Sequence, residues 1–430
     1  MNKKILSLAV AAAMVAPGAA MAEAILYGKL NMSIDWADVT NSISQGSVFP
    51  GVVDPDTGEQ LIDPIPDRDQ NYQGWGVNGG GYIPGEKRAN RIGVKGSEDL
   101  GNGLKAIYQV EFGIQMTEET RQLAATGANN SPTMRNSFLG LAGDWGTFLV
   151  GRHDTPLKIS TAKLDLFSDT MADYNGTARF NDVRVDNAIA YISPSLSGFQ
   201  LMAAVHAGGG STVTGTGATN GNIFADSIAE GWSAAGIYSN GPFYVSAAYE
   251  MFGNDLFMDS TTVLLGDPLF IDPVTGEAVA NPDFVADDFS VWRIGLGLLD
   301  WNGFTLSAIY EDQSDKVDGQ LWKSGGSDFA APTSLQIWQV QAGYAFGNNM
   351  VKAMYGAGSR DSNFDNALPE IDPYKNSLDG DYYTWAVGFD HNFSKRTKAY
   401  VLYTQVDDDA SQEINGTQWD GFSLGMMHSF

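Results

Sequence analysis

The sequence predicts an all-β protein, and more specifically a 16-stranded antiparallel transmembrane β-barrel. Apolar and polar residues alternate with period two along most of the chain, and short connections alternate with long ones. The 430 residues include 50 Gly, 22 Phe, 17 Tyr and 10 Trp, whereas only 18% of the residues are charged. This composition suits a protein with many tight turns and is a poor match to an acidic disordered chain, which would lack aromatic residues.

The N-terminus has the pattern of an export signal. Two lysines at positions 3 and 4 precede a short apolar run over 5–16, and Ala20-Met21-Ala22 has the small-x-small pattern of a cleavage site. About twelve apolar residues are too few to span a bilayer as a helix, and no later run is long enough. We therefore expect residues 1–22 to be a signal peptide and residues 23–430 to form one exported domain.

The alternation is clearest over residues 104–115. Leu, Ala, Tyr, Val, Phe and Ile fall on one face, and Lys, Gln and Glu fall on the other together with an isoleucine and a glycine. Similar runs occur at 26–36, 243–251, 304–311, 383–390, 397–404 and 421–430. A helix would show a period near 3.6, which these runs lack, so we interpret them as strands.

The connections between these strands predict how many there are. Short turns lie at Asp99–Gly103, Gly143–Gly146, Ser193–Gly198, Ser239–Pro242, Asp300–Gly303, Phe346–Asn349 and Asn392–Arg396. Longer polar segments lie at about 37–86, 117–133, 153–183, 207–230, 252–287, 312–332, 359–380 and 407–417. Seven turns and eight loops join sixteen strands, and short turns on one side with long loops on the other are typical of an outer-membrane barrel.

A soluble β-sandwich would also alternate, but it would bury its apolar face in a small core. Aromatic residues at the apolar strand ends instead favour a lipid-facing band flanked by two aromatic girdles. The expected girdle residues are Tyr249, Trp301, Tyr310, Tyr344, Tyr355, Trp385, Tyr403 and Phe430. An even number of strands lets the sheet close without free edges.

Charge and composition exclude several classes of function. The formal net charge of −26 argues against a general basic surface for nucleic acid. The absence of cysteine excludes disulfide frameworks, Cys-zinc sites, iron–sulfur clusters and thiol catalysis. His153 lies near Asp154 and Ser160, but no nucleophile elbow, phosphate loop or HExxH motif occurs. We therefore expect no enzyme.

Two long acidic loops share the motif Asp-Pro-x-Thr-Gly-Glu. Clustered carboxylates suit Ca²⁺, and the candidate ligands are Asp54, Asp56, Glu59, Asp272 and Glu277. The same residues also fit a Pro-Thr-Gly turn in a solvated loop, which is the interpretation that we favour. We expect no other cofactor or metal.

The segment Arg91–Glu111, with the sequence RIGVKGSEDLGNGLKAIYQVE, resembles the Gram-negative general porins, and most of all their neisserial and betaproteobacterial branch. Further matching segments are Leu26–Lys29, Arg135–Leu141, Trp145–Arg152, Val185–Tyr191 and the terminal Phe430. The resemblance implies a homotrimer in the outer membrane, in contact with its lipid and lipopolysaccharide. Each barrel would then be a water-filled channel for passive transport of small hydrophilic solutes and ions.

The resemblance also implies that the third long loop, 153–183, folds into the barrel and constricts it. Its segment 169–176 resembles the acidic tip of such loops, although the usual Pro-Glu-Phe-Gly-Gly is replaced by Ala-Asp-Tyr-Asn-Gly. The implied acidic residues of the constriction are Asp165, Asp169 and Asp173.

The alternation independently predicts a basic wall facing these acids. If the Phe, Leu and Val positions face lipid, several basic side chains on neighbouring strands face the lumen: Lys29, Arg91, Lys95, Lys105, Arg135 and Arg184. Opposed charges across a narrow gap orient water and polar solutes and bias ion selectivity. The alternative is that these charges only solvate a wet lumen.

These features predict a general diffusion porin, with two alternatives. A substrate-selective pore for phosphate or saccharides would want a ladder of lumen aromatics, and the inward candidates Tyr27, Tyr244 and Tyr400 form no clear ladder. A surface-binding or adhesive barrel would act through its acidic loops. The basic wall favours anions and the acidic loops favour cations, and we expect weak cation selectivity.

Overall fold

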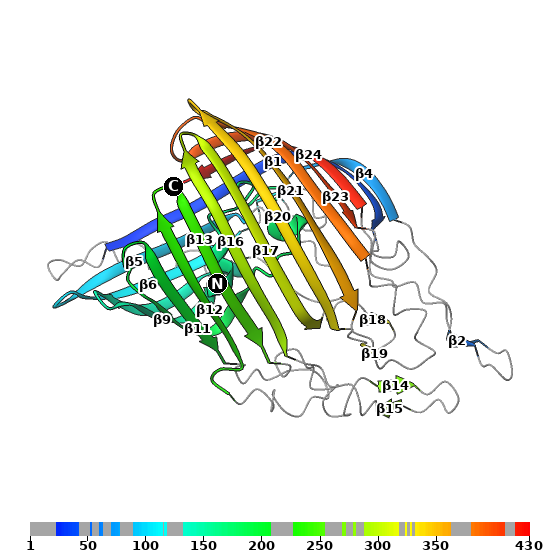
Figure 1. The fold of residues 1–430 in the computed structure, drawn as a ribbon, viewed down its shortest axis with the longest axis horizontal. Coiled ribbons are helices and arrows are strands. Elements are labelled where there is room, and N and C mark those ends of the chain that lie inside the picture. Colours follow the sequence, from blue (N-terminus) through cyan, green and yellow to red (C-terminus); the bar gives the residue numbers. More distant parts are fainter. Residues whose placement is uncertain are drawn as a thin grey trace, which may run out of the picture.

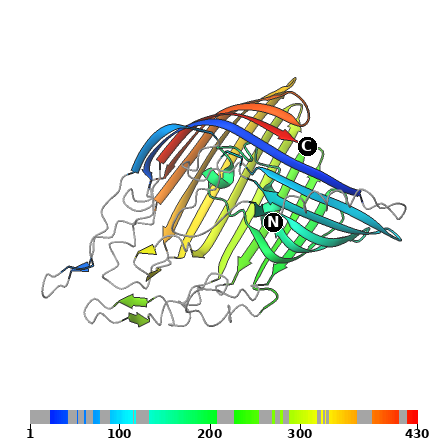
Figure 2. The same cartoon turned by 180° about the vertical axis from the view of Figure 1, so that it is seen from behind.

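Sixteen antiparallel strands close into a barrel in the computed structural model (Figures 1 and 2). The ring closes because β1 (Glu23–Ser42) pairs with the last strand, β24 (Gln418–Ser429), along one edge and with β5 (Arg91–Gly101) along the other. The structure describes residues 23–42, 52–53, 60–62, 70–77, 89–114, 116–117, 132–207, 227–253, 269–271, 278–280, 288–317, 323–324, 327–328, 332–362, 380–408 and 418–430. Among these residues no helix is long and apolar enough to cross a membrane.

The remaining barrel strands follow one another in chain order. They are β6 (Leu104–Gly113), β8 (Ser137–Gly143), β9 (Gly146–Asp154), β10 (Arg184–Ile192), β11 (Phe199–His206), β12 (Gly231–Asn240), β13 (Phe243–Phe252), β16 (Phe289–Trp301), β17 (Phe304–Val317), β20 (Pro332–Phe346), β21 (Asn349–Ser362), β22 (Gly380–Asn392) and β23 (Thr397–Asp408). The short β7 (Thr133–Met134) pairs with the end of β6. Within the described residues, three short antiparallel strand pairs lie outside the ring: β2 (Val52–Val53) with β3 (Gln60–Ile62), β14 (Leu269–Ile271) with β15 (Ala278–Ala280), and β18 (Lys323–Ser324) with β19 (Ser327–Asp328).

The first long connection is shorter than the sequence indicated. We expected a loop to begin at residue 37, but β1 continues to Ser42 because Ala37 and Val39 keep the alternation and are buried on the inner face. The chain then returns as β4 (Gln70–Val77), which pairs with β1 from residue 34 onward. Two strands therefore share one edge of β1, since β5 pairs with residues 23–29 and β4 pairs from residue 34 onward.

The barrel wall is uneven in height. Strands β8 to β11 have 7, 9, 9 and 8 residues, whereas β16, β17, β20 and β21 have 13, 14, 15 and 14. At about 3.4 Å per residue, the long strands extend some 20 Å further along their own direction. The tall side of the wall is visible at the front of Figure 1.

Aromatic side chains form a belt on the outer face near the long loops, which we call the loop-side belt. Its members are paired directly across strands: Tyr249 with Trp292, Tyr310 with Trp338, Tyr355 with Trp385, and Tyr403 with Phe422. Diagonal neighbours stay in contact, with ring centroids 5.0 Å apart for Trp292 and Tyr310 and 5.6 Å apart for Trp338 and Tyr355. The belt begins at Trp232 on β12 and ends at Trp36 and Trp75, which face each other on β1 and β4.

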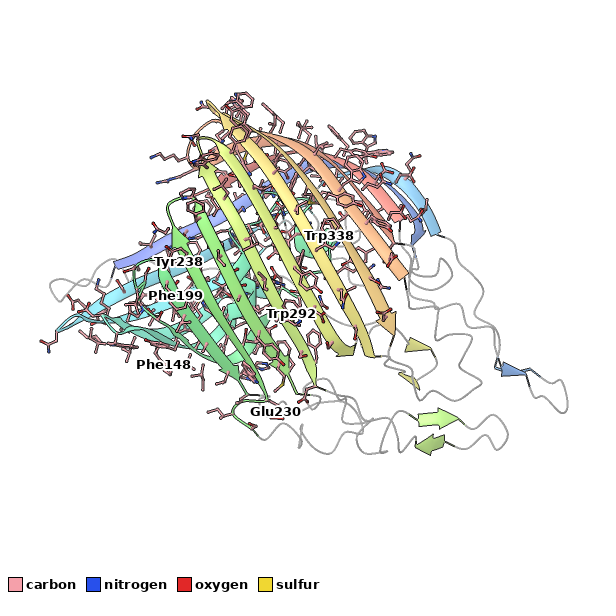
Figure 3. All side chains as sticks on the ribbon, viewed as in Figure 1. Phe148, Phe199, Glu230, Tyr238, Trp292 and Trp338 are labelled. Atoms are coloured by element: carbon pink, nitrogen blue, oxygen red, sulfur yellow. The ribbon has the colours of Figure 1, made fainter. Side chains whose placement is uncertain are left out.

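A second belt follows the short turns, and we call it the turn-side belt. It includes Phe199, Tyr238, Phe243, Trp301, Phe304 and Tyr344. Figure 3 labels Phe199 and Tyr238 from this belt and Trp292 and Trp338 from the loop-side belt. Exposed aliphatic residues such as Leu296 and Leu306 lie between the belts. Two aromatic belts around an apolar band are the outer surface of a membrane barrel.

The expected girdle residues all lie on the outer face of the barrel. Tyr249, Tyr310, Tyr355, Trp385 and Tyr403 belong to the loop-side belt. Trp301 and Tyr344 belong to the turn-side belt. The terminal Phe430 exchanges two backbone hydrogen bonds of 3.1 Å with Gly28, so the last residue completes the seam between β24 and β1.

Candidate pore constriction

The connection between β9 and β10, residues 155–183, folds into the barrel, and we call it the inserted loop (Figure 2). It leaves the wall through α2 (Pro156–Thr161), where Thr155 caps the helix and a proline occupies the first turn. The loop contains a second short helix, α3 (Tyr174–Thr177). The Thr155 N–H donates to the Val183 carbonyl at 3.4 Å, which closes the base of the loop.

Side chains from the wall bind the backbone of the outgoing half of the loop. The Tyr244 hydroxyl donates to the Ser160 carbonyl at 2.8 Å, and the Ser307 hydroxyl donates to the Leu164 carbonyl at 2.7 Å. The Lys352 ammonium donates to the Leu166 carbonyl at 2.7 Å. These contacts come from β13, β17 and β21, which are every second strand along this side of the barrel, so the loop follows the tall wall around the inside of the barrel.

Inward-facing glycines make room for the loop. A Cβ on Gly295 would lie 2.6 Å from Leu164 Cδ1, and a Cβ on Gly297 would lie 2.8 Å from Leu164 Cδ2. The same close approach occurs along the loop at Gly343 beneath Leu166, Gly388 beneath Phe167 and Gly421 beneath Met171. The loop side chains therefore pack directly on these glycines, which we call the glycine track, and a larger residue at any of them would require the loop side chains to shift.

Two ion-pair clusters hold the returning half of the loop. Arg293 on β16 is fully buried and donates to Asp182 at 2.7 Å, to Thr161 at 2.8 Å and to Glu311 on β17. A second ion pair joins Arg179 of the loop to Asp408 on β23, which also binds Arg360 at 3.2 Å. Contacts with the barrel wall therefore hold both the outgoing half and the returning half of the loop.

The three acids expected at the constriction differ in their surroundings. Asp169, at φ +60°, lies at the tip, with Oδ2 at 2.5 Å from Lys29 Nζ and 3.5 Å from Arg91 Nη1. Asp165 and Asp173 are buried inside the loop, where they accept backbone N–H bonds from Phe167, Tyr174, Asp169 and Asn175. Burial raises the pKa of Asp165 to about 6. Burial and the neighbouring Asp165 carboxylate raise the pKa of Asp173 well above its usual range.

Several of the expected basic residues contact carboxylates along β5, β6 and the segment before β8. Arg91 lies 3.9 Å from Glu111 on β6, and Arg135 donates to Glu111 at 2.7 Å. The Tyr27 hydroxyl also donates to Glu111, at 2.9 Å. Asp169, Arg91, Glu111 and Arg135 therefore form a continuous row of alternating charge from the loop tip along the wall.

The remaining basic residues lie at the two ends of this row. Arg184 binds Asp154 at 2.8 Å, and Lys158 of α2 binds the same carboxylate oxygen at 3.1 Å. The Lys95 ammonium lies 5.0 Å from the centre of the Tyr27 ring. Lys105 is exposed at the start of β6, opposite Asp99 in the strand register, away from the row.

Sequence reasoning missed several residues of this site. Glu111 lies on the predicted lumen face but is not among the residues expected at the constriction. It is six positions from Lys105 on the same strand, so the alternation of faces would have placed both side chains in the lumen. The roles of Asp182 and Arg293 depend on a contact between distant segments, for which the sequence offers no local signal. Asp154 and Lys158 are only four positions apart, but the contact of Asp154 with Arg184 again joins separate segments. The residues of the candidate Ca²⁺ sites and of the expected signal peptide lie outside the described residues.

Comparisons with known proteins place the chain among porins. The profile of a family described as Gram-negative porin matches residues 9–411. The chain is 26% identical to the major outer membrane protein P.IA of Neisseria meningitidis serogroup C, with 100% of both chains covered. An anion-selective porin from Comamonas acidovorans has the same fold, with a TM-score of 0.55 and 18% identity over 95% of this chain and 100% of that one. The trimer form of OmpT from Vibrio cholerae aligns with a TM-score of 0.53 and 13% identity, over 95% and 99%.

Proposed function

Since the chain belongs to the Gram-negative porin family and forms a diffusion channel in the outer membrane, we propose that this channel is a general pore for small hydrophilic solutes and ions. The observation that carries the proposal is the row of charged side chains between the tip of the inserted loop and strands β1, β5 and β6, from Lys29 through Asp169 and Arg91 to Arg135. Charged groups lining a narrow passage keep water and hydrated solutes in contact with polar partners, whereas an apolar solute loses hydration without compensation.

In this proposal the acidic tip residue and the basic wall residues define the constriction. Asp169 is the acidic member, and the basic members are Lys29, Arg91, Arg135 and Arg184. Lys95 lies beside this row, over Tyr27, whereas Lys105 lies near a short turn, away from the constriction. Asp165 and Asp173 contribute by shaping the loop: each accepts two or more hydrogen bonds that fix its backbone. Passage needs no binding step specific to one solute.

The inward tyrosines argue against a saccharide-selective pore. Tyr244 and Tyr400 are only 2% exposed; Tyr244 donates to the loop and Tyr400 to Asn31, at 2.8 and 2.9 Å. Tyr27 is engaged with Glu111 and Lys95. These rings cannot offer a ladder of free faces to a passing sugar.

Conductance across planar bilayers tests this function. A general pore gives a large conductance that rises in proportion to salt concentration, and it passes small sugars in liposome-swelling assays without saturation. Replacing the exposed loop residue Ser168 with tryptophan should lower conductance, whereas Ser195→Trp in a short turn is the control. A conductance that saturates with one solute would support a selective pore, and no conductance at all would favour the adhesive alternative.

We also propose that the protein is a homotrimer that packs through its short wall. The loop-side aromatic belt runs from β12 around the tall wall to β4, and at its level β9 and β10 instead carry an outward ion pair, Arg152 with Asp186. An ion pair at that level is costly in lipid but acceptable between protein subunits. Outward residues of the same strands that lie closer to the short turns, such as Leu139 and Val150, are aliphatic.

Crosslinking through single introduced cysteines can test this assembly, because the sequence contains no other cysteine that could react. A single cysteine at Leu139 on the short wall should join protomers through a thiol-reactive crosslinker, whereas a cysteine at Leu296 on the tall wall should not. Both residues are exposed, at 66% and 50%. Crosslinking at Leu296 alone would place the interface on the other wall, and none at either position would indicate a monomer.

A further inference from the structure

We propose that the turn between β22 and β23, Asn392–Arg396, binds the headgroup of an anionic phospholipid in the periplasmic leaflet of the outer membrane. We call these residues the basic turn. The site lies at the outer rim of the barrel rather than in the pore, so it goes beyond the proposed function. The proposal depends on where the charges of the short turns lie, on the exposure of the basic turn and on its place in the ring of strands.

The basic turn differs in charge from the other six short turns. In those six turns the charged residues are Asp99, Asp144 and Asp300, which are all acidic. The basic turn contains Lys395 and Arg396 and no acid, in a chain whose formal net charge is −26. Short turns lie on the periplasmic side of outer-membrane barrels. The two basic residues are therefore placed at the level of the phospholipid headgroups.

The two basic side chains of the turn have no acidic partner in the described part of the chain. Lys395 and Arg396 are exposed, and neither forms an ion pair there. Asp390, the acid closest to the turn in the sequence, points into the barrel, where it binds Lys352 at 3.0 Å and Lys398 at 2.8 Å. The positive charge of the turn is therefore available to a ligand on the outside of the barrel.

The end of the chain supplies a further charge near the turn. The Ser429 N–H donates to the Arg396 carbonyl at 2.8 Å, so the basic turn lies beside the C-terminal end of β24. The terminal carboxylate belongs to Phe430, whose backbone bonds to Gly28 of β1 on the opposite side of β24. Two basic side chains and this one carboxylate leave a net positive charge. A phosphodiester, which carries a single negative charge, matches that surplus.

Aromatic side chains place the basic turn at the membrane surface. Phe393 within the turn is 62% exposed, and its ring packs edge-on against the outward His391, with centroids 4.9 Å apart. Phe430 is 39% exposed and stacks on the outward His428 at 6.4 Å. Aromatic rings at this level contact the acyl chains and the ester region of lipids. The two rings would hold a lipid whose headgroup reaches the basic side chains.

His391 adds a polar group suited to a glycerol headgroup. Its Nδ1 atom lies 2.8 Å from Asn349 Oδ1, and because that oxygen is an acceptor, Nδ1 carries the hydrogen of the neutral ring. The Nε2 atom is then an acceptor, and no described residue donates to it. A hydroxyl of a glycerol headgroup fits this acceptor while the phosphate binds the basic turn. We therefore expect phosphatidylglycerol to be a ligand.

The place of the basic turn in the ring keeps it accessible to lipid. β22 is eight strands from β10 around the ring of sixteen, opposite the strands that carry the outward pair of Arg152 and Asp186. Protomers that contact each other through those strands, as proposed above, leave the basic turn facing the bilayer. An extended polymer of the cell wall would instead contact the tips of several turns, and the other six are acidic or uncharged.

Lipid binding by the whole protein in a non-ionic detergent tests the proposal. Phosphatidylglycerol or phosphatidylcholine is added at equal concentrations, and bound lipids are counted by native mass spectrometry. We expect wild type to prefer phosphatidylglycerol. In Lys395→Gln/Arg396→Gln, the turn variant, the affinity for phosphatidylglycerol should fall about 25-fold, because each basic group near a membrane surface contributes about fivefold. Binding of phosphatidylcholine and conductance should stay as in wild type.

The matched control removes two positive charges from inside the barrel. Lys105 and Lys163 are exposed, and Lys163 lies 5.9 Å from the centre of the ring of the inward Tyr244. The variant Lys105→Gln/Lys163→Gln has the same net charge as the turn variant and an unchanged outer rim. We expect it to bind phosphatidylglycerol like wild type.

Three results would overturn the proposal. They are no preference of wild type for phosphatidylglycerol, an unchanged affinity in the turn variant, and an equal loss in both double variants, which would reflect net charge alone. Sedimentation of wild type with purified peptidoglycan, lost in the turn variant while lipid binding persists, would assign the basic turn to the cell wall instead. None of these results requires a change in conductance, so each leaves the proposed function intact.

Discussion

The carboxylate of Asp169 lies 2.5 Å from the ammonium of Lys29, so the tip of the inserted loop is joined to the first strand of the barrel. The two residues are 140 positions apart in the chain. Around the same tip, Asn31 donates to the Asp169 carbonyl. The first strand therefore fixes the position of the loop tip and supplies part of the charge of the opening.

Replacing Asp169 with asparagine should shift selectivity towards anions. The substitution removes the one carboxylate shared by Lys29 and Arg91 and leaves the Asp169 carbonyl, which accepts from Asn31, in place. We expect the chloride-to-potassium permeability ratio to rise about two- to threefold, because one negative charge leaves the narrow part of the pore. The measurement is the reversal potential in a KCl gradient.

The buried neighbour provides the matched comparison. Asp173→Asn removes a carboxylate that faces the loop interior, and should change the permeability ratio much less than Asp169→Asn. Equal shifts in the two variants would show that Asp173 also acts on ions in the opening.

Removing Arg293 should release the returning half of the inserted loop. Arg293→Met takes away the cation that Asp182 and Glu311 share and leaves both carboxylates in a buried site. Breaking a buried ion pair on one side costs on the order of 3–5 kcal/mol. We expect increased open-channel noise and faster proteolysis within 155–183.

Arg360→Met is the control for this release. Arg360 shares Asp408 with Arg179, so Asp408 keeps one cationic partner after the substitution. Noise and proteolysis should then change far less than in Arg293→Met. Similar behaviour of both variants would mean that the ion pairs contribute equally and that Arg293 has no special part in holding the loop.

The packing of the inserted loop should weaken as pH rises through the acid range. Burial raises the pKa of Asp165 to about 6, above the value of about 3.9 that an unfolded chain gives. A carboxyl whose pKa is raised by folding stabilises the fold below its unfolded pKa, and this contribution is lost as pH rises through the folded pKa. The loss should therefore occur between about pH 4 and pH 6.

Asp165→Asn isolates this effect because asparagine resembles the neutral acid. We expect wild type and variant to melt at similar temperatures at pH 4, and the variant to be more stable than wild type by a few degrees at pH 7.5. Taking the difference cancels groups that titrate in both proteins. A difference in melting temperature that does not change with pH would contradict the assignment.

Period two and the turn residues were sufficient to predict sixteen strands, since each signal is local to its strand or turn. β4 was not predicted, because its pairing with β1 places Trp75 opposite Trp36, and that contact crosses a long loop. The basic wall was predicted from parity alone, and the strand register places Arg91 and Lys95 on the same face as Tyr27. The alternation could not predict which acids contact that wall. The backbone of the inserted loop decides this, because it directs Asp169 away from the loop, towards the wall, and Asp165 into the interior of the loop.

The glycine track gives the most direct test of how the loop is positioned. Gly295→Ala would place a Cβ 2.6 Å from Leu164 Cδ1 and 2.6 Å from Ser246 Oγ. Ordinary contact needs at least 3.4 Å, so we expect the Leu164 side chain, and the loop with it, to shift by about 1 Å away from the tall wall and into the opening. We expect single-channel conductance to fall.

The double variant Gly295→Ala/Leu164→Ala should recover part of the loss, because the shortened side chain leaves space for the new methyl group. Gly236→Ala on β12, where the nearest atom lies 3.6 Å away, should conduct like wild type. An unchanged or higher conductance in Gly295→Ala, with no effect of adding Leu164→Ala, would show that contact with β16 does not position the loop.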